Sequence, residues 1–166
     1  PAQPVAYWRL GEIVASPLQQ GSLSGWLATD ATGSHHAIYE PGVALYLPGP
    51  RGTGLQQEPR GNRAAHFAGG RVLADVPEVA DNWSFECWVW NGFPNSDRAV
   101  TGYFFSRGPN GSPDVAGDHL GIGGSYENRG LDGRLIVFNG NRQNQILSGK
   151  TVLAVRTWHH VVYVRS

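Results

Sequence analysis

The segment Asp81-Asn-Trp-Ser-Phe-Glu-Cys-Trp-Val-Trp90 alternates its side chains with a period of two and is rich in aromatic residues. Because successive side chains of a β-strand point to opposite faces of a sheet, the pattern predicts a strand over Trp83–Trp90. One face would carry an apolar set suited to a core: Trp83, Phe85, Cys87 and Val89. The other face would combine indole rings with a carboxylate: Ser84, Glu86, Trp88 and Trp90.

A second alternating run, Thr157-Trp-His-His-Val-Val-Tyr-Val164, predicts another strand near the end of the chain. The other apolar runs are short and are bounded by Gly, Pro, Asn or Ser, and no long segment holds helical periodicity. We expect further strands at Val5–Leu10, Tyr39–Leu47, Arg63–Ala68, Arg71–Leu73, Tyr103–Arg107, His119–Gly123, Gly133–Phe138 and Gln145–Leu147. Gly11–Ser24 reads as a loop, and Gly69-Gly70 reads as the turn of a hairpin between its flanking strands. The sequence therefore predicts an all-β chain, built as a sandwich or a barrel.

Composition limits the class of protein. With 166 residues, of which 40% are hydrophobic, the chain can bury a core as a single domain over residues 1–166. Thirteen basic residues balance thirteen acidic ones, so the positive field expected of a nucleic-acid-binding protein is absent. No apolar run is long enough to predict membrane insertion. Cys87 is the only cysteine, so we expect a buried, inert thiol.

Several short segments, which we call landmarks, follow one another along the chain in an order typical of one family: Tyr7-Trp-Arg-Leu-Gly-Glu12, Asp30-Ala-Thr-Gly-Ser-His-His36, Ala65-His-Phe-Ala-Gly-Gly70, Trp83–Trp90, Gly133-Arg-Leu-Ile-Val137 and Trp158-His-His-Val161. In this order the chain resembles the laminin G-like jelly-roll domains of the concanavalin A-like lectin/glucanase superfamily. The resemblance implies a two-sheet antiparallel jelly-roll sandwich.

The resemblance also implies a function and a setting. Such domains are non-catalytic carbohydrate-binding or recognition modules of larger secreted or cell-surface proteins, so we expect an extracellular, periplasmic or cell-surface location. A glycan or another surface protein would be the partner. Domains of this kind continue beyond the Trp158–Val161 landmark, and we therefore expect the domain to be truncated at its C-terminal end. Its remaining strands, or other domains of a larger protein, would cover the open edge.

The outward face of Trp83–Trp90 supplies the main candidates for ligand binding. Trp88 and Trp90 are candidates for stacking on sugar rings, with Glu86 as a polar neighbour. Tyr126 and Asn128, in a predicted loop, are alternative contacts. The alternative for the tryptophans is structural, since such indoles also pack beneath loops.

Asp30 is the candidate metal ligand, because a carboxylate on a tight turn suits the all-oxygen coordination of calcium, which the family often carries near one rim. The alternative is an Asx-turn in which Asp30 only caps its own backbone. The pairs His35-His36 and His159-His160 are expected to be ordinary hydrogen-bonding residues, because neighbouring residues of a strand point to opposite faces.

Two other functions stay open at this point. One is a structural or protein-interaction domain without a sugar site. The other is a glycoside hydrolase of the same fold, which would need two carboxyl groups close together. The glucanase pattern Glu-x-Asp-x-x-Glu is absent from the sequence, and this favours a protein that is not an enzyme.

Overall fold

The computed structural model describes residues 3–20, 23–52, 61–77, 82–108, 117–138 and 146–166. The described residues form an all-β structure of several antiparallel sheets, with one short 3-10 helix, η1 (Tyr126–Asn128). The chain divides into two compact units, Pro1–Trp83 with Val164–Ser166, and Ser84–Tyr163. We call them unit 1 and unit 2. Among the described residues, no helix is long and apolar enough to span a membrane.

Unit 1 contains two small antiparallel sheets. The first has the strand order β1 (Pro17–Gln20), β2 (Leu23–Ala28), β3 (Ala37–Tyr39) and β6 (Val72–Ala74). The second pairs β4 (Val43–Pro48) with β5 (Arg63–Phe67). The core of the unit centres on three fully buried side chains, Ala28, Ala37 and Tyr39. The hydroxyl group of Tyr39 donates a hydrogen bond of 2.7 Å to Glu12, which satisfies its one polar atom inside the core.

Several strand predictions for unit 1 are wrong. Val5–Leu10 is not a strand: its one β-bridge joins Trp8 to Asp30, and the side chains of Trp8 and Leu10 pack against the core. Gly11–Ser24 is not a continuous loop, because it contains β1 and the start of β2. The predicted strand Tyr39–Leu47 is divided into β3 and β4 by a turn at Gly42, whose φ of 97° favours glycine.

The hairpin predicted around Gly69-Gly70 is also wrong. Its first strand, β5, pairs with β4, whereas its second strand, β6, pairs with β3. The two segments therefore belong to different sheets. Pairing partners depend on residues distant in sequence, and a turn signal does not report them.

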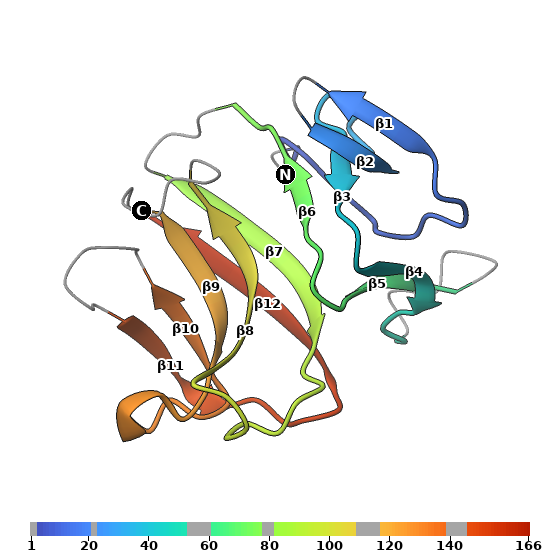
Figure 1. Ribbon diagram of the computed structural model, residues 1–166. Coiled ribbons are helices and arrows are strands. Elements are labelled where there is room, and N and C mark those ends of the chain that lie inside the picture. The colour runs from blue at the N-terminus through green and yellow to red at the C-terminus, as the bar shows by residue number, and fades with distance from the viewer. Residues whose placement is uncertain (1–2, 21–22, 53–60, 78–81, 109–116, 139–145) are drawn as a thin grey trace. The chain divides into compact units, whose positions relative to one another are not determined.

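Unit 2 combines a four-stranded sheet with a pair of long strands (Figure 1). The sheet has the order β11 (Ile146–Val152), β10 (Arg134–Phe138), β9 (Asp118–Gly123) and β8 (Val100–Arg107). The pair consists of β7 (Trp83–Trp90) and β12 (Trp158–Arg165), which run in opposite directions and extend by a few residues into unit 1. The prediction of a strand over Trp83–Trp90 is confirmed at both ends.

The two layers of unit 2 meet through apolar side chains. The rings of Phe85 on β7 and Phe105 on β8 lie 4.1 Å apart between centroids. The buried apolar residues of the two layers include Leu120, Ile122 and Ile136 from the sheet and Val161 from β12. Unit 2 is thus sandwich-like, and β7 and β12 each turn one face toward the sheet.

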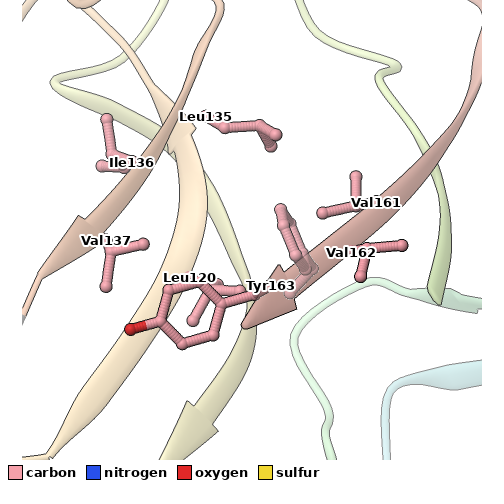
Figure 2. A pocket seen from close by; sticks show the side chains of 8 residues that line it. Leu120, Leu135, Ile136, Val137, Val161, Val162 and Tyr163 are labelled. Carbon is pink, nitrogen blue, oxygen red and sulfur yellow. The ribbon is translucent and has the colours of Figure 1, made fainter. Parts of the chain in front are cut away.

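A small apolar cavity of about 70 Å³ remains between the layers. Figure 2 shows the side chains that line it; the seven labelled ones come from β9, β10 and β12, and Phe104 of β8 completes the lining. Ligand pockets are several times larger and contain converging polar groups. This cavity is therefore a packing defect of the core rather than a ligand pocket.

Candidate functional site

The residues of β7 alternate between half-buried and exposed along the whole strand, as its sequence predicts. The outward side chains of Trp88 and Trp90 are 42% and 48% exposed. Glu86, on the same side, has 68% of its side chain exposed. The three candidates on this strand therefore share one accessible face.

Strand β12 adds two further aromatic side chains to that face. The imidazole ring of His160 stacks on the indole of Trp88, with 5.0 Å between centroids and 28° between planes. Trp158 meets Trp90 edge to face at 5.6 Å. We refer to Glu86, Trp88, Trp90, Trp158 and His160 together as the aromatic face.

A polar pair lies within the aromatic face. His160 Nε2 is 2.8 Å from Glu86 Oε1. An ionised carboxylate can only accept hydrogen bonds, so the Nε2–H of His160 is the donor, which fixes the proton position on the imidazole. The stack on Trp88 and this bond together hold the imidazole in one orientation. The imidazole in turn orients the carboxylate.

Sequence reasoning missed Trp158 and His160 as members of the site. The two residues are separated by one position in the second alternating run, which places both on the same face of β12 and could have identified them. The strand register that aligns them with Trp90 and Trp88 could not be predicted from the sequence, because it pairs distant segments: His160 and Glu86 are 74 residues apart. His159, on the opposite face, bonds to the carbonyl oxygen of Ala154 at 2.8 Å.

Tyr126 and Asn128 lie elsewhere in unit 2, on η1, beyond the ends of β9 and β10 (Figure 1). Two backbone hydrogen bonds attach this helix to the loop before β8, from Ser125 N to Arg98 O at 2.9 Å and from Tyr126 N to Ala99 O at 3.2 Å. The Tyr126 side chain is 37% exposed. The structure thus places the predicted ligand contacts in two locations, the aromatic face and η1.

Asp30 occupies a different environment, in unit 1. Its side chain is only 2% exposed, and its carboxylate accepts five hydrogen bonds. Oδ1 receives the N–H groups of Tyr7 and Thr32, at 2.7 and 3.0 Å. Oδ2 receives the Thr32 hydroxyl and the N–H groups of Ser34 and His35, the latter two at 3.2 and 2.8 Å. Burial alone opposes ionisation, but these donors outweigh it and hold the pKa of Asp30 far below its usual range.

This arrangement favours the structural alternative for Asp30. A cation would have to displace donors that already use both carboxylate oxygens. Within the described part of the chain, no group of three or more His, Cys, Asp or Glu side chains is placed to hold a metal ion. The assignment of Asp30 as a calcium ligand stays a prediction.

Cys87 lies on the inward face of β7 and is half-buried rather than fully buried. Burial, together with the charge of neighbouring Glu86, raises the pKa of its thiol to about 12. Because the thiolate is the reactive species, we expect native Cys87 to react with a thiol reagent at neutral pH at least about a hundredfold more slowly than in denaturant. Equal labelling rates in the two conditions would show that the side chain faces solvent and that the strand register is wrong.

Comparisons with family models, with curated proteins and with solved structures found no match to this chain. The resemblance to laminin G-like domains consequently depends on the landmarks in the sequence.

Proposed function

We propose that this chain is a non-catalytic recognition module that binds a glycan on the aromatic face. The observation that carries the proposal is the joint exposure of Trp88, Trp90 and Glu86 on one side of β7. Flat indole faces stack on the apolar C–H groups of sugar rings, and a carboxylate accepts hydrogen bonds from hydroxyl groups. The aromatic face offers both kinds of contact to one ligand.

Trp90 is the principal stacking residue in this proposal. Trp88 is less exposed and already has the His160 ring stacked on it. Trp90 is the more exposed indole, and its partner Trp158 meets it edge to face. A sugar ring would therefore gain most of its contact area on Trp90.

The same proposal includes a fold and a setting. The layered packing of unit 2 and the order of the sequence landmarks support a jelly-roll sandwich of the laminin G-like type. Such a module would act outside the cytoplasm as part of a larger secreted or surface protein. Because the outward faces of β7 and β12 carry a single carboxylate, Glu86, they support binding rather than the paired-carboxylate chemistry of a glycosidase.

One observation favours the second candidate, a protein-interaction domain without a sugar site. Val162 follows His160 on the outward side of β12 and is 55% exposed. It extends the apolar surface beyond the aromatic rings, and an apolar patch framed by polar groups is typical of protein interfaces.

Glycan binding can be tested on an array, followed by titration of the strongest ligand. We expect Trp90→Ala to weaken binding roughly tenfold, equivalent to about 1.4 kcal/mol. Trp26→Ala is the matched control, because Trp26 is 44% exposed but lies on β2 in unit 1. Binding that survives Trp90→Ala, or that falls equally in the control, would contradict the proposed site. A protein that binds no glycan would favour the interaction domain.

A further inference from the structure

The aromatic face carries a distinctive set of charges. Its strands β7 and β12 are described along their whole length, and their outward side chains in unit 2 are Ser84, Glu86, Trp88, Trp90, Trp158, His160 and Val162. This set contains one carboxylate and neither lysine nor arginine. Arg156 lies in the turn before β12, and Arg165, the last residue of β12, alternates to the opposite face of the strand from His160.

We propose that the ligand is a glycan without carboxylate or sulfate groups, selected by the Glu86–His160 pair; this inference rests on the proposed function. A hydroxyl hydrogen of the sugar would bond to the Glu86 carboxylate, and a hydrogen bond to an ionised acceptor is stronger than one between neutral groups. An acidic sugar at the same position would meet a like charge, and the outward residues of β7 and β12 in unit 2 include neither lysine nor arginine to offset it. Its repulsion from Glu86 at about 4 Å corresponds to a loss of affinity of roughly tenfold or more.

His160 is a positioning residue in this proposal. Its Nε2–H binds one carboxylate oxygen, so the carboxylate is oriented before ligand arrives. A mostly exposed glutamate would otherwise sample several rotamers and lose that freedom on binding. The His160 ring is itself fixed by its stack on Trp88.

The spacing of the outward residues indicates an oligosaccharide. Glu86, Trp88 and Trp90 are alternate residues of one strand, and a strand rises about 3.3 Å per residue, so they span about 13 Å. This span exceeds one sugar ring. A ring stacked on Trp90 and a neighbouring ring bonded to Glu86 would together occupy it.

The test compares neutral glucose and galactose oligosaccharides with the same chains oxidised to uronic acids, using the whole chain. We expect the wild-type protein to bind the neutral member of the preferred pair at least tenfold more tightly. Glu86→Gln should weaken binding of the neutral chain about fivefold, because the variant keeps the shape of the side chain but not its charge. The affinities for the neutral and the oxidised chain should then be nearly equal. His160→Ala should weaken binding of the neutral chain. His160→Gln, which retains an N–H donor, should bind the neutral chain more tightly than His160→Ala does.

The outcomes separate this inference from the proposed function. If neutral chains bind and Trp90→Ala weakens their binding as expected, but Glu86→Gln leaves the ratio of affinities unchanged, the aromatic face binds glycans and the charge selection is wrong. Tighter binding of the oxidised chain to the wild-type protein would likewise overturn the selection. If no chain binds, or Trp90→Ala has no effect, the proposed function itself fails.

Discussion

Replacing Asp30 with alanine is expected to lower the melting temperature of the protein by at least about 5 °C, measured by circular dichroism. The substitution removes the acceptor of five hydrogen bonds inside unit 1 and leaves their donors without a partner. These five bonds are partly buried, and a partly buried donor that loses its acceptor is costly because it has lost part of its hydration. The bond from Tyr7 also attaches the N-terminal segment to the turn, so the loss should loosen both.

Asp75→Ala is the matched control for this variant. Asp75 is an exposed aspartate of the same unit, and its replacement should leave the melting temperature nearly unchanged. We expect the difference between wild type and Asp30→Ala to persist in the presence of a chelator, because protein donors already hold the carboxylate. If chelator alone lowered the wild-type melting temperature to that of the variant, calcium binding at Asp30 would be supported instead.

The contribution of Asp30 should also depend on pH. The pKa of Asp30 is lowered in the folded state, so the stability that it provides is complete above the ordinary aspartate pKa of about 3.9. It is lost as the pH falls below that value, where the unfolded chain takes up a proton more readily than the folded one. The difference in melting temperature between wild type and Asp30→Ala should therefore be constant near neutrality and shrink in acid.

The strand that carries the candidate site was predictable because its signal is local. The alternation from Trp83 to Trp90 gives both the limits of β7 and the face that each side chain occupies. The three candidates on it, Glu86, Trp88 and Trp90, consequently lie together. The addition of Trp158 and His160 depends on strand register, which no local pattern encodes.

The failures in unit 1 have physical causes of the same kind. The strand β1 begins with Pro17 and is short and largely polar, a composition that reads as a loop. It is nevertheless an edge strand, where a proline at the first position costs no ladder hydrogen bond. Val5–Leu10 has the apolar residues of a strand, but the Asp30 carboxylate supplies one of its backbone partners. Long-range polar contacts of this type replace sheet pairing and leave no periodic trace in the sequence.

Replacing Gly124 with alanine is expected to lower the melting temperature by about 5–10 °C. A Cβ atom at Gly124 would overlap the carbonyl oxygen of Arg98 and lie 2.9 Å from that of Ala99. Both contacts are with backbone, so no side-chain rotation relieves them. The same two carbonyl groups accept the hydrogen bonds from Ser125 and Tyr126 that attach η1 to the loop before β8.

Gly102→Ala is the control, because a Cβ at Gly102, on β8 of the same unit, meets nothing within 4 Å. This variant should keep its stability.

The Gly124 variant also distinguishes between the two locations of the predicted ligand contacts, since it displaces Tyr126 and Asn128 while the aromatic face lies on β7 and β12. We expect Gly124→Ala, assayed well below its melting temperature, to bind glycan as the wild type does. A loss of glycan affinity in the folded variant would indicate that the binding site lies at η1. Trp90→Ala would then be expected to have no effect on binding.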